Sequence, residues 1–353
     1  FLITEGMHFL SIENQTKALN SFLKAHELMP ENAAVNSKIA EIYQQSEEYD
    51  NALFYAVNAN QQTPENHFYA ALLANIQTET GDLSGAIKTY EELLNSSDVD
   101  AVYISTPHTL HAELSIKAAG KGKHILCEKP AAVNLLEGQK VINSVREAGV
   151  FYVEGFMYRC HPQIPALLKL IKDNKIGKIN KIISSFGFDM KKIIPNSRLF
   201  DKNLAGGAIL DVGLYPISFS RLIAGVATGK KFLNPIEIDA EARIGETGVD
   251  EIATANLRFN NNITAKVSTA ILQNMKNNAI IEGSEGYIEL DQPWAPGRDG
   301  GPYHSKIKIN IKGKEEILEF KGPEHLFFFE SELSSQTILK ERLEVPHPGM
   351  TWE

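Results

Sequence analysis

The sequence predicts a multidomain α+β protein made of helical repeats, a short parallel α/β unit, and a mainly antiparallel β-sheet domain with helices. Three observations predict this class: a 34-residue repeat early in the chain, an apolar strand–helix–strand pattern after it, and later runs that alternate apolar and polar residues. The 353 residues suffice for two or three folding units, each with its own hydrophobic core. We expect these units at residues 1–97, 98–155 and 156–353.

Residues 1–97 contain the repeat. Small residues and prolines recur there every 34 residues, which lets paired antiparallel helices approach closely and ends each pair at a proline. The recurring positions are Ala18, Ala52 and Ala86, with Pro30 and Pro64. The segment resembles tetratricopeptide repeats, which have this period. The resemblance implies a concave face that binds a peptide partner; a helical spacer and unrelated amphipathic hairpins are the alternatives.

A βαβ unit follows the repeats. Residues 100–107 form a short apolar run ended by turn residues, which predicts a buried parallel strand. A helix at 108–120 leads to a second strand at 124–127, and a helix at 135–148 leads to a third strand at 150–154. This order predicts part of a doubly wound, Rossmann-like parallel sheet.

The last part of the chain predicts an antiparallel sheet with one wet face, because its runs have a period of two residues. Hairpin turns are expected at residues 260–262 and 282–286, which are rich in Asn and Gly. The alternating runs are 181–188, 236–244, 251–259, 263–272, 279–290, 306–311 and 316–320.

The composition limits which classes of partner the protein can have and which cellular compartment suits it. The net charge is −9 and the basic residues are scattered, which argues against nucleic acid or an anionic membrane as partner. Apolar runs fall short of the ~20 residues that span a bilayer. Two cysteines, Cys127 and Cys160, in ordered segments suit a reducing compartment, so we expect the cytoplasm. The histidines lack the spacing of a metal site. Because the chain starts at Phe1 and has no terminal cap, we expect both ends to be cut.

The first polar cluster that could carry chemistry is Ser105-Thr106-Pro107, with His111 nearby. It follows a predicted parallel strand, and open parallel sheets bind ligands at the carboxyl ends of their strands. Small hydroxyls and a rigid proline could line a flat ring there. The alternative is an ordinary helix start, with Thr106 as N-cap and Pro107 as the first helical residue.

The second cluster, Glu128-Lys129-Pro130, follows the next predicted strand. Pro130 cannot continue the ladder, so it fixes the place of the lysine. A solvated surface charge is the alternative reading of Lys129.

The third cluster is formed by Asp211 and Tyr215, which follow paired glycines and open an apolar helical run. The glycines permit close backbone approach. A spacing of four residues places the carboxylate and the phenol on one helical face. A surface aspartate and a core tyrosine are the alternative.

Three strings, residues 102–108, 122–130 and 206–216, resemble the glucose-fructose oxidoreductase, inositol dehydrogenase and MocA (Gfo/Idh/MocA) family from about residue 90 to the end. Tyrosine at 215 is similar to the branch that contains dihydrodiol dehydrogenase and glucose-fructose oxidoreductase. The resemblance implies an NAD- or NADP-dependent oxidoreductase of a sugar, polyol or dihydrodiol. It also implies a homodimer through the C-terminal sheet.

The resemblance further implies roles for individual residues. Lys129 and Tyr215 flank the reacting carbinol, and Asp211 orients the substrate. Glu128, Lys129 and the turn from Ser105 to His111 touch the nicotinamide ribose. Arg159, in a further matching segment at 156–162, lies near the cofactor or substrate. The residues implied at the cofactor are Ser105, Thr106, Pro107, His111, Glu128, Lys129 and Arg159.

Elementary chemistry supports the two catalytic roles. A phenol of pKa about 10 is too weakly ionised at neutral pH to act as a base unless a cation stabilises its phenolate. Lys129 can be that cation for Tyr215. In the reverse direction Tyr215 protonates a developing alkoxide, and the ammonium stabilises its charge. No metal is required.

One expected motif is missing from the sequence. Such enzymes seat the pyrophosphate on a G-x-G-x-x-G turn between a strand and a helix. Before Asp98 the glycines are Gly6, Gly81 and Gly85, none of which follows a predicted strand. We therefore expect a recombined or misassembled chain with impaired cofactor binding. The alternative function is a non-catalytic, chimeric protein-interaction scaffold that carries a remnant oxidoreductase domain.

Overall fold

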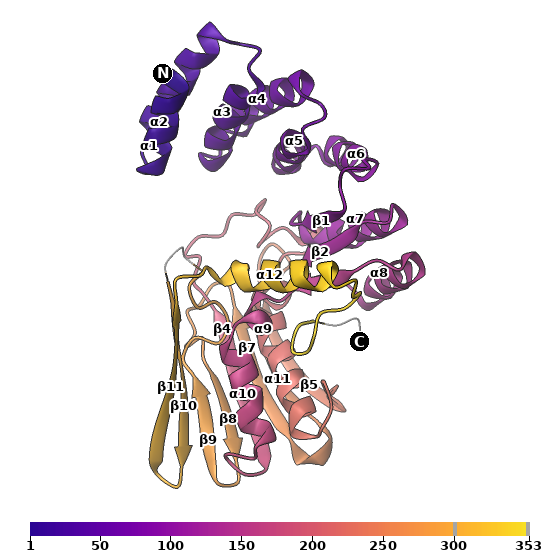
Figure 1. Ribbon diagram of the computed structural model, residues 1–353. Helices are drawn as coiled ribbons and strands as arrows, with labels where there is room; N and C mark the ends of the chain where they lie inside the picture. Colours follow the sequence, from indigo (N-terminus) through magenta and orange to yellow (C-terminus); the bar gives the residue numbers. More distant parts are fainter. Residues whose placement is uncertain (299–301, 351–353) are drawn as a thin grey trace. The chain divides into compact units, whose positions relative to one another are not determined.

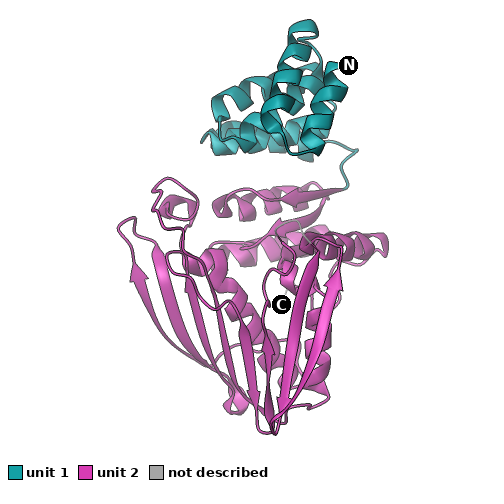
Figure 2. Ribbon diagram, turned by 90° about the vertical axis from the view of Figure 1, so that its left-hand side faces the viewer, with its two compact units in different colours: residues 1–100 teal, residues 101–353 magenta. Residues whose placement is uncertain are grey.

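The computed structural model of the protein describes residues 1–298 and 302–350. The chain forms two compact units, Phe1–Asp100 and Ala101–Glu353, drawn in separate colours in Figure 2. The first unit is helical, and the second contains a three-stranded sheet and an eight-stranded sheet.

The first unit consists of six helices that pack in consecutive pairs. Asparagine caps recur with the repeat: the side chains of Asn32 and Asn66 accept N–H groups at the starts of the second and third pairs. The small residues that the repeat predicts at Ala18, Ala52 and Ala86 are fully buried. The helices are α1 (Leu2–Ser11), α2 (Gln15–Leu28), α3 (Ala33–Gln45), α4 (Tyr49–Gln62), α5 (His67–Glu79) and α6 (Leu83–Leu94).

The second unit begins with a three-stranded parallel sheet of order β1-β2-β3. Its strands are β1 (Ala101–Ile104), β2 (His124–Glu128) and β3 (Tyr152–Gly155), joined by α7 (His108–Gly120) and α8 (Leu135–Ala148). The predicted strand–helix–strand order is therefore present. The predicted helix cap is off by one residue: Pro107 is the N-cap of α7 and Thr106 lies outside the helix.

An eight-stranded sheet of order β11-β10-β9-β8-β4-β7-β6-β5 forms the rest of the second unit (Figure 1). Its strands are β4 (Ile179–Gly187), β5 (Glu237–Ile244), β6 (Asp250–Arg258), β7 (Thr264–Ala270), β8 (Ala279–Gly283), β9 (Gly286–Leu290), β10 (Tyr303–Ile311) and β11 (Lys314–Gly322). Pairing is antiparallel except between β4 and β7. That pair is parallel because the chain crosses from β4 through a helix and the β5–β6 hairpin before it returns.

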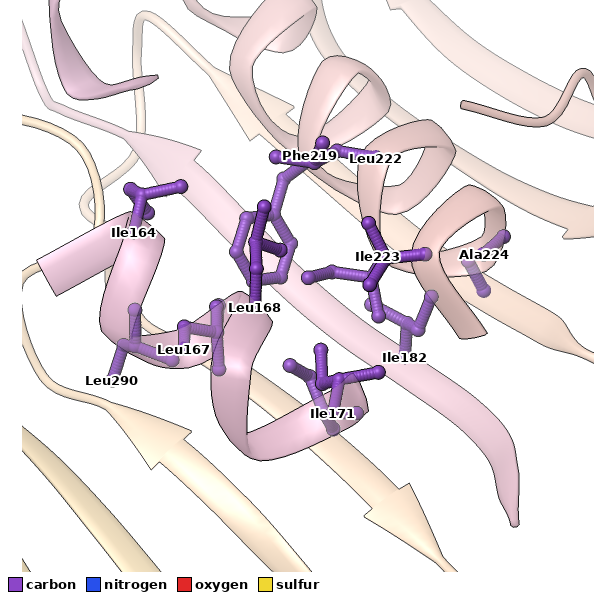
Figure 3. Packing of buried hydrophobic residues seen from close by; sticks show 14 of the residues in the cluster. Ile164, Leu167, Leu168, Ile171, Ile182, Phe219, Leu222, Ile223, Ala224 and Leu290 are labelled. Carbon is purple, nitrogen blue, oxygen red and sulfur yellow. The ribbon is translucent and has the colours of Figure 1, made fainter. Parts of the chain in front are cut away.

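Two helices, α10 (Gln163–Lys172) and α11 (Leu214–Ala227), supply the core against this sheet. Figure 3 shows Leu167 and Leu168 of α10 facing the same apolar layer as Phe219 and Ile223 of α11. Burying each such side chain contributes about 1.5–3 kcal/mol. Among the described residues, the second unit also contains α9 (Met157–Cys160), before α10, and α12 (Leu326–Leu339), near the carboxyl end. Its other short helical turns are Lys202–Leu204, Ile209–Gly213 and Asn260–Asn262.

One helical stretch, Lys202–Ala227, has the length and apolar composition of a membrane span. It contains α11, and 72% of its apolar window is buried inside the protein. The stretch therefore reads as a core helix of the second unit.

Candidate active site

Lys129 follows β2 directly, so its side chain starts at the carboxyl end of a parallel strand. Its Nζ donates to the backbone oxygen of Asp211 over 2.6 Å and lies 3.3 Å from the carboxylate Oδ1 of the same residue. The two residues are 82 positions apart in the chain. Only 13% of the lysine side chain is exposed, so it is a held charge and not a freely solvated one.

Asp211 lies in a π-helical turn, Ile209–Gly213, directly before α11. Such turns are rare and occur frequently at functional sites. Gly207 precedes the turn with φ +118°, and a Cβ there would overlap the Asp250 side chain. The Asp250 carboxylate in turn accepts the Ile209 N–H over 2.7 Å. The predicted close approach at the paired glycines is therefore what seats the turn that carries Asp211.

Arg198 is a second cation on Asp211, and the sequence reasoning missed it. Its NH1 donates to Asp211 Oδ1 over 2.8 Å, while 58% of the arginine side chain stays exposed. Burial raises the pKa of the Asp211 carboxyl, but the charges of Lys129 and Arg198 outweigh it and hold that pKa below its usual value. Asp211 is therefore a buried, ionised carboxylate between two cations rather than a surface charge.

Tyr215 lies four residues further along, in α11, and is 3% exposed. The Lys129 Nζ lies 5.7 Å from the centroid of the Tyr215 ring. The structure therefore brings an amine, a carboxylate and a phenol together from two distant segments. The ring also packs in an aromatic cluster with centroid distances of 5.2 to 6.2 Å to Phe156, Tyr158, Phe186 and Trp294.

The environment of Tyr215 favours the protonated phenol. Burial raises its pKa well above the usual value, and the Glu128 and Asp211 carboxylates raise it further. The sequence argument expected Lys129 to lower this pKa. Here the ammonium is already paired with Asp211, so burial and the two carboxylates prevail. This geometry suits Tyr215 as a proton donor.

Two family models match the chain. The model described as "Oxidoreductase family, NAD-binding Rossmann fold" matches residues 18–156, and the "GFO/IDH/MocA C-terminal domain" matches residues 164–289. The trans-1,2-dihydrobenzene-1,2-diol dehydrogenase of Mus musculus is 33% identical over 242 residues, which cover 69% of this chain and 68% of that protein. The chain belongs to the GFO/IDH/MocA oxidoreductase family.

Solved oxidoreductase structures are similar to this chain in fold and sequence. A 3-ketoreductase from Actinomadura kijaniata, in complex with TDP-benzene and NADP, is 27% identical with a TM-score of 0.59, covering 73% of this chain and 74% of that one. An aldose-aldose oxidoreductase from Caulobacter crescentus is 25% identical with a TM-score of 0.63, covering 74% and 75%. The chain spans about two thirds of the length of the curated relatives it matches.

In this GFO/IDH/MocA chain, the family model begins to match earlier than the resemblance in the sequence does. The Rossmann-fold model starts at residue 18, whereas the resemblance in the sequence begins at about residue 90 and its first string at residue 102. Residues 18–100 form helices without a strand in this structure, and parallel strands begin at Ala101. The parallel-sheet part of the match is therefore the three-stranded sheet.

The end of β1 offers a fit for one end of a nicotinamide dinucleotide. The Thr106 Oγ1 is buried and has no hydrogen-bond partner among the described residues. Ser105 and Pro107 flank it before α7 begins. An orphaned hydroxyl at the carboxyl end of a parallel strand is suited to a polar group of a ligand. The sequence provides no comparable glycine turn for the pyrophosphate.

Three other predicted cofactor residues already bind protein groups. Glu128 accepts the Tyr103 hydroxyl over 2.7 Å. His111 lies between the backbone carbonyls of Thr106 and Pro130. Arg159 is buried, and its guanidinium donates to the Ser218 side chain and backbone and to one carbonyl near the carboxyl end. A contact of these residues with cofactor stays a prediction.

Residues 1–298 and 302–350 contain no group of three or more His, Cys, Asp or Glu side chains placed to hold a metal ion.

Proposed function

We propose that this chain is an NAD- or NADP-dependent oxidoreductase of a sugar, a polyol or a dihydrodiol, with Tyr215 as the acid and base. The observation that carries the proposal is the approach of the Lys129 ammonium to within 5.7 Å of the Tyr215 ring, with the ammonium held by Asp211. The names of the relatives, a dihydrodiol dehydrogenase, a 3-ketoreductase and an aldose-aldose oxidoreductase, support this substrate class.

The three side chains divide the work on the substrate oxygen. The protonated Tyr215 donates its proton to the alkoxide that develops when a carbonyl is reduced. The Lys129 ammonium stabilises the negative charge on that oxygen. Asp211 accepts a substrate hydroxyl and fixes the position of Lys129. A nicotinamide cofactor held beside these side chains would supply hydride in this direction and accept it in the other.

Ser105, Thr106 and Pro107 at the end of β1 would hold the nicotinamide ribose, together with Glu128 and Lys129. Without a glycine turn, the pyrophosphate loses the backbone seat that usually supplies much of its binding. We therefore expect impaired affinity for either cofactor. Titration of the purified chain with NADPH and NADH by calorimetry tests this: a dissociation constant in the micromolar range or below would contradict the expected impairment.

A non-catalytic interaction protein is the second candidate function, favoured by the helical first unit and the missing glycine turn. In that case the helices are a tetratricopeptide array that binds a peptide, and the open face of the eight-stranded sheet joins two copies of the chain in a homodimer. A cytoplasmic location and a homodimer fit either function. Light scattering of the purified chain decides the dimer, since a monomer at micromolar concentration would exclude it.

Turnover separates the two functions. We expect oxidation or reduction by the purified chain in a panel of hexoses, pentoses, polyols and dihydrodiols with both cofactors at millimolar concentration. Tyr215→Phe should lose activity by orders of magnitude and keep its fold. Tyr287→Phe, on the eight-stranded sheet, is the matched control and should keep full activity. Unchanged turnover in Tyr215→Phe would refute the acid assignment, and no turnover on any substrate would favour the interaction protein.

A further inference from the structure

His111 lies between two loops that the candidate active site uses. It is in the first turns of α7, and only 1% of it is exposed. Its Nδ1 lies 2.7 Å from the Pro130 carbonyl oxygen, and its Nε2 lies 2.6 Å from the Thr106 carbonyl oxygen. Thr106 belongs to the loop after β1, and Pro130 belongs to the loop after β2. The imidazole therefore spans the carboxyl ends of both strands.

This arrangement leaves the ring no free polar atom. Both nitrogens are within hydrogen-bond distance of backbone oxygens, and an oxygen without a proton can only accept. A ring nitrogen already held by a carbonyl cannot at the same time recognise a ribose. The contact with cofactor that the family resemblance implies for His111 stays a prediction, and it would compete with these two backbone contacts.

We propose that His111 is a positioning residue for Lys129. Its ring lies between the Thr106 and Pro130 carbonyls and donates to one of them when neutral and to both when protonated, which ties the loop after β1 to the loop after β2. Pro130 is the next residue after Lys129, so this tie fixes the backbone from which the lysine reaches Asp211. The proposal rests on the proposed function only for its effect on turnover, because the tie itself is a property of the folded chain.

The number of carbonyls that His111 can bind depends on the protonation state of its ring. A neutral imidazole has one N–H and can hold one carbonyl, whereas an imidazolium holds both, with stronger charge-assisted bonds. The charged groups that act on it are Glu128 and Lys129 at the end of β2, and the nearest titratable ring on its own helix is His108, at 5.9 Å between centroids. Burial lowers the pKa of His111 more than the two carbonyls and Glu128 raise it. The second tie therefore forms as the pH falls below the usual histidine range.

Hydrogen exchange tests the tie without any need for activity. We expect His111→Phe, which keeps a ring and removes both N–H groups, to speed exchange of backbone amides in residues 105–108 and 128–131 by at least tenfold. His111→Gln keeps an amide donor and should restore much of the protection in one loop. His161→Phe is the matched control, because it also replaces a fully buried imidazole and lies outside both loops. Unchanged exchange in both loops of His111→Phe would overturn the proposal.

A measurement on the unmutated chain covers the case in which His111→Phe fails to fold. Nitrogen NMR of histidine-labelled protein, followed from pH 8 downward, should show one ring N–H of His111 at first and a second one only below the usual histidine range, both slow to exchange with water. A His111 ring that exchanges freely at both pH values would overturn the proposal.

Kinetics then separate positioning from cofactor binding. We expect His111→Gln to lower kcat roughly 10-fold to 100-fold, to change the Kd for NADPH less than twofold, and to lose the part of the pH profile that follows the His111 titration. A raised Kd for NADPH with unchanged kcat would overturn the proposal in favour of a cofactor contact. If the unmutated chain shows no turnover, the proposed function fails, while the exchange and NMR results still decide the tie.

Discussion

The two units of this chain differ in how far apart in the sequence their contacting residues lie. In the helical unit, Ala18 and Phe22 pack against Val35 and Ile39, which lie in the next helix along the chain. In the second unit, Lys129 meets Asp211 from 82 positions away. Short-range cores follow from a repeat that is visible in the sequence, whereas a site assembled over long range depends on how the strands and helices are arranged. The two units should therefore respond separately to substitution.

The largest effect is expected from Lys129→Met, which keeps the length of the side chain and removes its charge. Turnover should fall by about 10² to 10⁴, because the ammonium no longer stabilises charge on the substrate oxygen. Circular dichroism should show both units folded. Lys169→Met, which removes an exposed partner of Asp173 on α10, is the control and should keep full turnover. Equal rates in the two variants would show that the long-range pair is not part of the site.

Glu330 on α12 should make the second unit, but not the first, lose stability as the pH rises. Burial, and then the charge of Glu128, raise its pKa from 4.5 to about 8. The folded state therefore holds a proton that the unfolded state releases above pH 4.5. Its contribution is complete below that pH, falls as the pH rises, and is fully lost above about 8.

Glu330→Gln should remove this slope and raise stability at pH 8.5 by on the order of 5 kcal/mol. Urea unfolding at pH 4.5, 6.5 and 8.5 measures it. Glu332→Gln, exposed on the same helix, should leave the slope as it is. A slope that survives in Glu330→Gln would show that another group causes it.

Gly207→Ala tests the backbone that seats Asp211. Its φ of +118° and the overlap of a Cβ with Asp250 predict a loss of about 3 kcal/mol in the second unit. Gly229→Ala is the matched control: φ is +75° there and nothing lies within 4 Å of the added Cβ, so a loss of only about 1 kcal/mol is expected. Thermal unfolding compares the two variants, and equal losses would mean that the contact with Asp250 is unimportant.

The smallest effect is expected in the helical unit. Ala52→Leu places extra volume at a fully buried contact between helices and should cost about 1–3 kcal/mol there. Ala34→Leu, at an exposed position on α3, should cost little. Hydrogen exchange of the backbone amides in α1 to α6 reports this unit, and turnover should not change in either variant. A loss of turnover in Ala52→Leu would show that the two units are coupled.

Local signals were enough to predict many of the elements. The helices at 108–120 and 135–148 have the predicted bounds, because a proline or asparagine starts each one and a glycine stands at or beside its end. The parallel pairing of β4 with β7 could not be predicted, since alternation shows which residues are buried and not the direction of a neighbouring strand.

The site was predictable only in part, and mostly through the family resemblance. No residue pattern marks the π-helical turn at Ile209–Gly213, because it differs from an α-helix only in its hydrogen-bond register. Arg198 reads as an ordinary solvated charge, and more than half of its side chain is indeed exposed. Its role at Asp211 depends on a loop that brings it back to the start of α11. The two ring contacts of His111 likewise depend on how the loops after β1 and β2 fold against α7.

Arg198 connects the buried Asp211 carboxylate to solvent, because the guanidinium that pairs with it is itself exposed. Mobile ions screen a charge in water within about 8 Å at physiological ionic strength. They can surround the exposed guanidinium but not the buried Lys129 ammonium on the other side of Asp211. Concentrated salt should therefore weaken the pairing of Asp211 with Arg198 more than its pairing with Lys129, so that the charge environment of Lys129 varies with salinity.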